Sequence, residues 1–345
     1  MNRKSHVSGK SRVLILLVAV LVLGGVAVGA TLHAAGRAAE KDHARSGGPD
    51  VRSGEVTLDA PGVSVFRNMA WGPHRDEIAS VPAGDPTGPR TSSGVRCLRF
   101  HTAGGTGVCL RAVRGGLRDT YRAVVLDSRL RETRRYDLAG VPSRARVSPG
   151  GRSAAWTVFV SGDSYAGTAF STRTSVLDLR TGHLDRTLED YRFFLDGRPR
   201  KPVDLNVWGV TFADDTRFYA TAATGGRTYL VRGDRAARTL HTVHTNVECP
   251  SLSPDGTRVA YKKRVEGASS DAPWRLYVLD LRTLRETPTA ERRSVDDQAV
   301  WRDGRTLVYS LPGDYGSDLW TVPADGSGSP SVSMRAALAP AFTAR

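Results

Sequence analysis

One turn-and-strand unit recurs along this chain, and it constrains the fold more than any other feature of the sequence. Its clearest copy is Ser253-Pro254-Asp255-Gly256, which precedes the hydrophobic segment 259–261 and, about fifteen residues later, the largely apolar segment 276–281. Proline, aspartate and glycine in this order favour a tight chain reversal. The unit therefore predicts a turn, a strand, a loop and a second strand of an antiparallel sheet.

Weaker copies begin at Trp71, Ala103, Ser148, Phe212 and Trp301, so successive copies are 32, 45, 64, 41 and 48 residues apart. A four-stranded blade of a β-propeller takes about 40–50 residues. The sequence predicts an all-β, six-bladed β-propeller, and a five-bladed ring is the alternative if the first copy belongs to its neighbour. We expect segments 55–66 and 334–345 to supply the strands that the short first interval lacks and to close the ring.

The Ser253 unit resembles the repeat of TolB-type β-propellers, because the turn is followed by Val259-Ala260-Tyr261 and by the segment Leu276 to Leu281. The resemblance covers roughly residues 60–340 and implies a propeller and a location in the cell envelope. TolB itself carries an α/β domain before its propeller, whereas only about fifty residues precede the first repeat here. The resemblance therefore does not imply a role in the Tol complex.

The N-terminal region has the pattern of a targeting element, with four basic residues followed by an uncharged run. The run is about 20 residues long, enough to cross a bilayer as a helix, and a cleavage site at Val28-Gly29-Ala30 is the alternative. We expect a single-pass cell-membrane protein with its propeller outside the cytoplasm, or a secreted one if the segment is cleaved. The expected parts are a cytoplasmic tail (1–12), an anchor or signal segment (13–32), a linker (33–54) and the propeller (55–345).

Three cysteines are present, and two of them flank a short hairpin-like segment. A hairpin centred near Ala103 would place Cys97 opposite Cys109, which predicts a disulfide as one alternative and two free thiols as the other. A disulfide suits an oxidising compartment. Cys249 lies in an apolar strand, where we expect a buried thiol rather than a reactive one.

The net charge of +14 raises the question of an acidic partner. Only six of the 49 basic residues are lysines, and the arginines are spread over the whole chain without a nucleic-acid recognition motif. We therefore expect no nucleic-acid binding, and at most a weak attraction to anionic lipids or wall polymers.

Long insertions are predicted on the face opposite the Ser253-type turns. The largest, Asp190 to Pro202, contains Tyr191, Arg192 and Phe193, residue types that dominate protein interfaces. The alternative is that Phe193 to Leu195 form an ordinary strand that packs on the blade beneath.

A second candidate site is the mouth of the central channel, because the first strand of each blade lines the axis. Polar residues stand at the start of several of these strands and could hold a small polar ligand, a cation or a peptide of a partner, or could satisfy one another. They are Arg144, Arg146, Asn206, Asn246, Glu248, Asp296, Asp297 and Gln298.

Catalytic and metal-binding motifs are missing from the sequence, including Gly-x-Ser-x-Gly, His-Glu-x-x-His and the P-loop. We expect no cofactor and no metal. The sequence favours a monomeric interaction or sensing module that binds an envelope protein or a cell-wall ligand. The alternatives are a hydrolase or lyase acting on a peptide or glycan through Glu248, Asp296 and Asp297, and a structural envelope protein recruited by charge.

Overall fold

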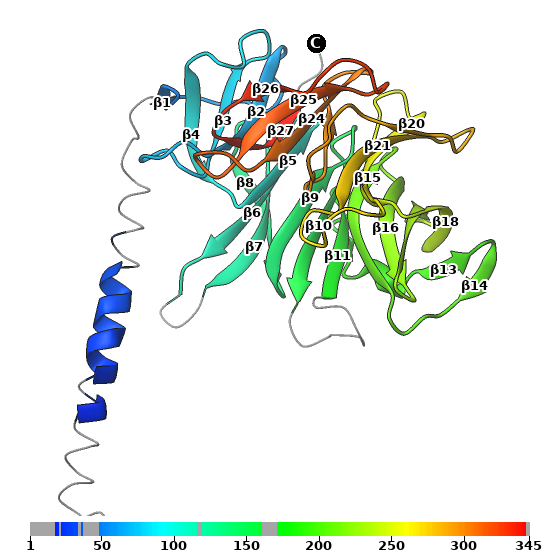
Figure 1. Ribbon diagram of the computed structural model, residues 1–345, viewed down its shortest axis with the longest axis horizontal. Coiled ribbons are helices and arrows are strands. Elements are labelled where there is room, and N and C mark those ends of the chain that lie inside the picture. The colour runs from blue at the N-terminus through cyan, green and yellow to red at the C-terminus, as the bar shows by residue number, and fades with distance from the viewer. Residues whose placement is uncertain are drawn as a thin grey trace, which may run out of the picture.

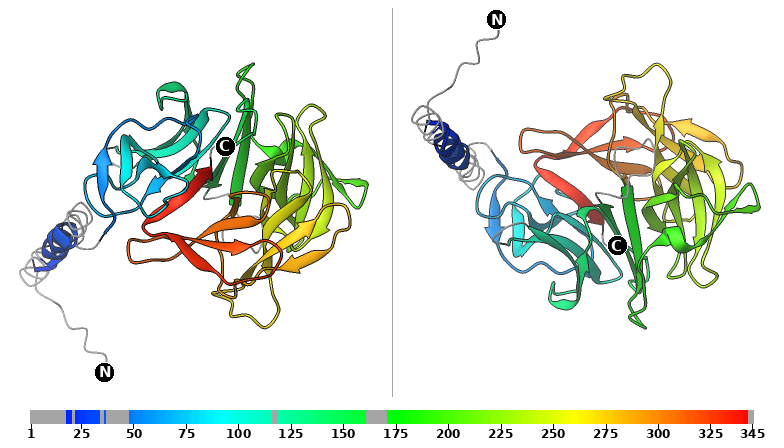
Figure 2. Two further views of the ribbon diagram at one scale, coloured as in Figure 1. Left: turned by 90° about the horizontal axis from the view of Figure 1, so that it is seen from above. Right: turned by 90° about the horizontal axis from the view of Figure 1, so that it is seen from below.

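Six β-sheets surround a common axis like the blades of a propeller, as the views from above and below show (Figure 2). The computed structural model describes residues 18–20, 22–33, 36, 48–115, 119–160 and 171–342. Over these residues, from Val51 onward, regular structure consists of strands and of one short 3-10 turn, η1 (Leu188–Asp190). The predicted all-β, six-bladed propeller is confirmed, and the five-bladed alternative is wrong.

The innermost strands of neighbouring blades contact one another at the axis, and the other strands follow outward. From the axis outward, the blades contain β27 (Ala337–Phe342), β2 (Val63–Asn68), β3 (Glu77–Pro82), β4 (Arg90–Arg96) and β1 (Val51–Ser53) in blade 1; β5 (Arg99–Ala103), β6 (Thr106–Val113), β7 (Thr120–Leu126) and β8 (Glu132–Leu138) in blade 2; β9 (Val141–Val147), β10 (Ser153–Val160), β11 (Ser171–Asp178) and β12 (Leu184–Asp185) in blade 3; β15 (Asn206–Phe212), β16 (Arg217–Thr224), β17 (Arg227–Asp234), β18 (Thr239–Thr245), β13 (Arg192–Leu195) and β14 (Arg198–Arg200) in blade 4; β19 (Glu248–Leu252), β20 (Arg258–Arg264), β21 (Trp274–Asp280) and β22 (Glu286–Pro288) in blade 5; and β23 (Val300–Trp301), β24 (Thr306–Leu311), β25 (Asp318–Pro323) and β26 (Ser331–Met334) in blade 6.

The turn at Ser253 joins β19 to β20, as its sequence predicts. The Ser253 hydroxyl accepts a hydrogen bond of 3.0 Å from the backbone N–H of Arg258, and Asp255 accepts one of 3.0 Å from the N–H of Thr257. Gly256 has a φ of +72°, which suits glycine, and its N–H donates to the carbonyl of Ser253. At this turn, side-chain oxygens thus accept the hydrogen bonds of backbone N–H groups that have no partner on a neighbouring strand.

The ring is closed by its two ends, because the C-terminal strand β27 pairs antiparallel with β2 (Figure 1). Segments near both ends therefore complete blade 1, as expected.

One predicted equivalence of the turns is wrong, however. The Trp71 turn joins β2 to β3, the second and third strands counted from the axis, whereas the Ser253-type turns join the first strand to the second. Blade 1 has no such turn, since β27 and β2 come from opposite ends of the chain. This explains the short first interval.

The long third interval holds an extra hairpin at the outer edge of blade 4. Strand β13 pairs in parallel with β18, and β14 pairs antiparallel with β13. Phe193 is buried among the core residues of blades 3 and 4, and the buried Tyr191 hydroxyl donates a hydrogen bond of 2.9 Å to Asp185. Arg192 points to solvent. The insertion thus forms strands that extend blade 4. This is the alternative to an exposed binding loop that the sequence left open.

The hydrophobic core lies between the faces of adjacent blades. Phe66 from blade 1, for example, packs in one buried cluster with Val308 and Leu319 from blade 6. Similar clusters join blades 3 and 4 and blades 5 and 6. Side chains on the two faces of a blade therefore pack against the neighbouring blades. This packing fixes the position of the innermost strands, which carry the axial residues.

Cys97 and Cys109 form a disulfide next to the junction of blades 1 and 2, with Cα atoms 5.3 Å apart. The predicted register is wrong, because Cys109 pairs with Phe100 in the β5–β6 hairpin. Cys97 precedes β5, in the link that leaves β4, and reaches β6 from there. Cys249 is a buried free cysteine, in agreement with the sequence.

Residues 18–20 and 22–33 of the N-terminal region are helical and exposed. Within the described part of the chain, no helix is both long and apolar enough to cross a membrane. The predicted tail 1–12, residues 13–17 and most of the linker lie outside the described residues. Residues 51–53, placed in the linker by the sequence, form β1 beside β4.

Candidate functional site

Charged side chains from several blades meet where the axis opens on the face that carries the blade-to-blade connections. We call this place the channel mouth. The first strands β5, β9 and β19 begin there, and the connection 289–299 between blades 5 and 6 passes over it. Of the eight predicted residues, six have contacts here: Arg144, Arg146, Glu248, Asp296, Asp297 and Gln298.

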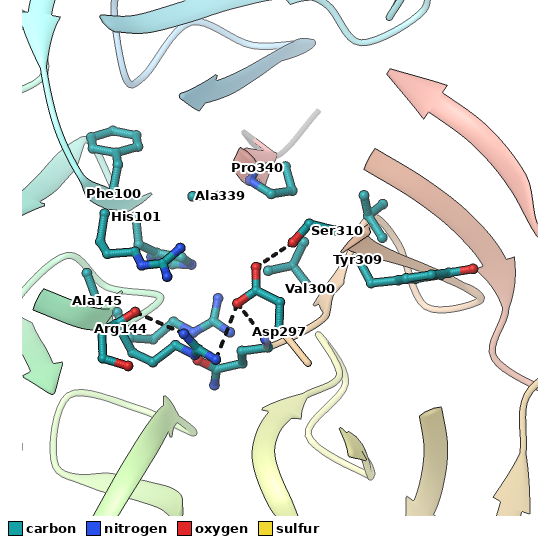
Figure 3. A pocket seen from close by; sticks show the side chains of 15 residues that line it. Phe100, His101, Arg144, Ala145, Asp297, Val300, Tyr309, Ser310, Ala339 and Pro340 are labelled. Carbon is teal, nitrogen blue, oxygen red and sulfur yellow. Dashed lines mark hydrogen bonds and ion pairs between the residues drawn. The ribbon is translucent and has the colours of Figure 1, made fainter. Parts of the chain in front are cut away.

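Asp297 lies at the centre of the channel mouth (Figure 3). One carboxylate oxygen is 3.6 Å from Nη2 of Arg144 and accepts a hydrogen bond of 2.9 Å from the backbone N–H of Gln298. The other oxygen accepts a hydrogen bond from the Ser310 hydroxyl. Burial alone would raise the pKa of Asp297, but the charges of Arg144 and Arg99 outweigh burial and hold the pKa below its ordinary value.

Two arginines of β9 point to the same place and differ in their partners. Arg144 donates to the carbonyls of Ser143 (3.0 Å) and Asp296 (3.3 Å) in addition to its ion pair with Asp297. Burial opposes its charge, yet the surrounding negative groups raise the pKa of Arg144 above its ordinary value. Arg146 is 7% exposed, and burial lowers its pKa to about 10 despite the charge of Asp297.

Arg99 and His101 of β5 belong to the same cluster, although they were not among the predicted residues. Burial lowers the pKa of Arg99. Burial, and then the charge of Arg146, hold the pKa of His101 well below its ordinary value. The ring is therefore neutral, and because Nδ1 accepts the N–H of Val147 at 3.1 Å, Nε2 carries the proton. The rule that selected Arg144, a polar residue on a first strand, would also have found Arg99.

A cavity of about 40 Å³ lies between these side chains. Its charged lining consists of Arg99, Arg144, Arg146 and Asp297, and Figure 3 shows the side chains of Arg144 and Asp297 turned toward each other. An apolar wall that includes Phe100, Val300, Val308, Ala339 and Pro340 completes the lining. The cavity thus has one polar and one apolar side.

Lys262 of β20 organises the acidic side of the channel mouth. Its Nζ atom is 2.5 Å from Asp296 and 3.8 Å from Glu248. The same atom lies 4.4 Å from the centre of the Trp274 ring, a cation–π contact. Burial raises the pKa of Glu248, and Lys262 counteracts this only in part. Lys262 was not predicted, because it stands on a second strand.

Gln298 ties the blades together across the axis. Its Nε2 donates to the carbonyl of Pro250 at 2.5 Å and lies 3.3 Å from the carbonyls of Gly209 and Val210. These carbonyls belong to blades 4 and 5, whereas Gln298 enters blade 6. The Gln298 side chain therefore links three blades beside the cavity.

The remaining predicted residues lie elsewhere. Asn206 is buried and accepts a hydrogen bond of 2.9 Å from the N–H of Thr172 in blade 3. Asn246 exchanges hydrogen bonds with the backbone of Arg264. Tyr191, Arg192 and Phe193 belong to the edge of blade 4, and two of these side chains are buried. A binding role for these residues stays a prediction.

In the residues that the structure describes, no group of three or more His, Cys, Asp or Glu side chains could hold a metal ion. The carboxylates of the channel mouth are each paired with a cation: Asp297 with Arg144, and both Asp296 and Glu248 with Lys262. These ion pairs hold the three carboxylates in fixed positions.

No protein-family model matches the sequence, and no curated protein matches it. The TolB-type family is therefore not confirmed. Among solved structures, a chain of the nidogen/laminin complex is 11% identical, with a TM-score of 0.51 over 81% of this chain and 97% of that one.

A peptidase and a domain of a protease are also similar. A Mycobacterium tuberculosis puromycin-hydrolyzing peptidase is 17% identical (TM-score 0.48), over 80% of this chain and 44% of that one. The β-propeller domain of the Trilobed protease from Pyrococcus furiosus is 15% identical (TM-score 0.42), over 68% and 69%. The chain thus spans less than half the length of the puromycin-hydrolyzing peptidase.

Proposed function

We propose that this protein is a binding module whose propeller holds a charged ligand at the channel mouth. The observation that carries the proposal is the convergence of Arg99, Arg144, Arg146 and Asp297 on one small cavity from three parts of the ring. Lys262 holds Asp296 at the same channel mouth. Concave sites with a few converging polar groups and an apolar wall are the usual form of a ligand site.

The paired carboxylates support binding over hydrolysis. A general acid or base works best with a pKa near the operating pH. Asp297 has a lowered pKa and is held by Arg144 and Ser310, so it stays a carboxylate that orients its neighbours. Glu248 has a raised pKa and is the residue on which the hydrolase or lyase alternative would depend.

A paired binding and turnover screen tests the proposal. The full chain, kept in a nonionic detergent, would be screened by thermal shift against small charged compounds and short peptides, and the same mixtures would be analysed by mass spectrometry. A ligand that raises Tm in the wild type but not in Lys262→Met, and that is recovered intact, supports the proposal. Cleavage of a peptide or glycan that is lost in Glu248→Gln would favour the enzyme instead. An exposed control, Arg282→Met, should bind as the wild type does.

We also propose that the propeller works outside the cytoplasm, at the cell envelope. The disulfide between Cys97 and Cys109 supports this location, because such bonds persist in oxidising compartments. Basic residues before the apolar segment 13–32 support export. Alkylation of thiols in the protein as isolated from cells would test it: only Cys249 should react after unfolding, and labelling of all three cysteines would contradict the proposal.

A further inference from the structure

Two of the arginines that line the axial cavity have unused hydrogen-bonding capacity. The guanidinium groups of Arg99 and Arg146 both line the cavity, and along the described part of the chain neither of them has a hydrogen bond or an ion pair to another residue. The Nε atoms of Arg144 and Arg146 are buried and have no hydrogen-bond partner among the described residues. Buried polar groups are nearly always hydrogen-bonded, so these donors point to a missing acceptor.

The charges around the cavity are unbalanced in the same direction. Three arginines line it, and Asp297 is the one carboxylate in the lining. Lys262 pairs with both Asp296 and Glu248, so these three groups offset the excess by one charge only, and the channel mouth keeps a net charge of about +1. Burying cations without an equal number of anions is unfavourable. An anion in the cavity would remove both the excess charge and the unused donors.

The size and the lining of the cavity limit what this anion is. About 40 Å³ accommodates roughly three water-sized atoms, at about 10–15 Å³ each. A carboxylate group has three non-hydrogen atoms, and its two oxygens match the fork of a guanidinium. The neutral imidazole of His101 adds one more donor, Nε2–H, to this lining. The wall formed by Val308 and Pro340 suits the carbon end of such a ligand.

We propose that the axial cavity binds a carboxylate, either a short aliphatic acid or the terminal carboxylate of a larger ligand, through Arg99, Arg144 and Arg146. This inference rests on the proposed function, since it names the chemical class of the ligand held at the channel mouth. Asp297 competes with the ligand for Arg144 and sets the orientation of that guanidinium. The ligand is bound at the channel mouth, where Gln298 links three blades beside the cavity.

Acetate is the first probe. With the full chain in a nonionic detergent, Tm would be measured as acetate replaces chloride at constant ionic strength, and the affinity would be measured by titration calorimetry. We expect a saturable rise in Tm, and binding about 10- to 100-fold weaker in Arg146→Met and in Arg99→Met, the usual effect of losing a hydrogen bond to a charged group. Arg282→Met removes an exposed arginine and should bind as the wild type does.

Asp297→Asn is the decisive variant, because it should bind acetate more tightly. The substitution removes a negative charge and frees Arg144, whereas a residue with a merely structural role would give weaker binding or none. Circular dichroism would establish that each variant is folded. If Arg146→Met does not fold, Arg99→Met and Asp297→Asn still decide the question, because they shift the affinity in opposite directions.

A larger ligand is tested with trialanine and its C-terminal amide. Binding of the free acid alone supports the proposal. Equal effects of acetate and chloride, or binding of phosphate or sulfate without acetate, would overturn it. If no carboxylate binds while the screen above yields a ligand sensitive to Lys262→Met, this inference fails and the proposed function stands. If the screen also yields nothing, both fail.

Discussion

Arg144 and Asp297 are far apart in the sequence, yet their side chains form an ion pair of 3.6 Å across the propeller axis. Arg144 comes from the innermost strand of blade 3, and Asp297 from the connection that enters blade 6. Ser310 and the backbone N–H of Gln298 hold the carboxylate from the other side. The pair therefore links opposite sides of the ring and shapes the cavity between them.

Asp297→Asn should lower the free energy of unfolding by about 2 kcal/mol at pH 7, somewhat less than a fully buried pair would, because the side chain keeps 24% of its exposure. The pKa of Asp297 is lowered in the folded protein. Its contribution is thus complete above the unfolded pKa of about 3.9 and is lost as the pH falls through the folded pKa. Urea unfolding at pH 7 and at pH 3 would measure both effects. Asp137→Asn, at an exposed pair with Arg122, serves as the control.

Glu189, in η1, should make the protein less stable as the pH rises. Burial raises its pKa to about 7, although its carboxylate accepts the N–H of Val207 at 2.9 Å. Between the unfolded pKa of about 4.3 and the folded value, the folded state binds the extra proton, so stability falls as the pH increases. We expect a loss of about 3 kcal/mol from pH 4.5 to pH 8 that is absent in Glu189→Gln.

Urea unfolding across that pH range would measure the slope. An exposed control, Glu266→Gln, should keep the slope of the wild type. A slope in Glu189→Gln equal to that of the wild type would show that another group is responsible.

The double variant Cys97→Ser, Cys109→Ser should unfold about 3 kcal/mol more easily than the wild type, the value expected for a loop of this length. The disulfide joins residues at the junction of blades 1 and 2, so its loss frees the link between β4 and β5. Equilibrium unfolding would measure the change. Cys249→Ser leaves the disulfide intact and controls for the loss of a thiol; if it were as damaging as the double variant, the disulfide would not be the cause.

Phe193→Ala should lower the free energy of unfolding by about 3–5 kcal/mol, because Phe193 is buried in the core shared by blades 3 and 4. Arg192→Ala, at the exposed neighbouring position, should change it by no more than about 0.5 kcal/mol. Chemical unfolding of the two variants compares them directly. Similar stabilities would mean that Phe193 is not a core residue, and its role would then lie in binding.

Much of the fold could be predicted from local patterns. The turn at Ser253 forms from the chemistry of Ser253, Asp255 and Gly256, whose hydrogen bonds are all local. The number of such units gave the number of blades. The Trp71 unit was misassigned because the closing pair of strands, β27 and β2, lies at opposite ends of the chain. No local pattern records which strand pairs with which over that distance.

The sequence by itself determined the repeated blades, the chain ends that close the ring and the polar character of the first strands. The tertiary structure alone decided which polar residues meet. Arg144 and Asp297 were both candidates, but Asn206 and Asn246 stood at similar positions and face other partners. Lys262 and Arg99 joined the cluster only through packing. A small tilt or bulge of each blade decides whether a side chain reaches the axis, because the register of a strand sets the direction of every side chain along it.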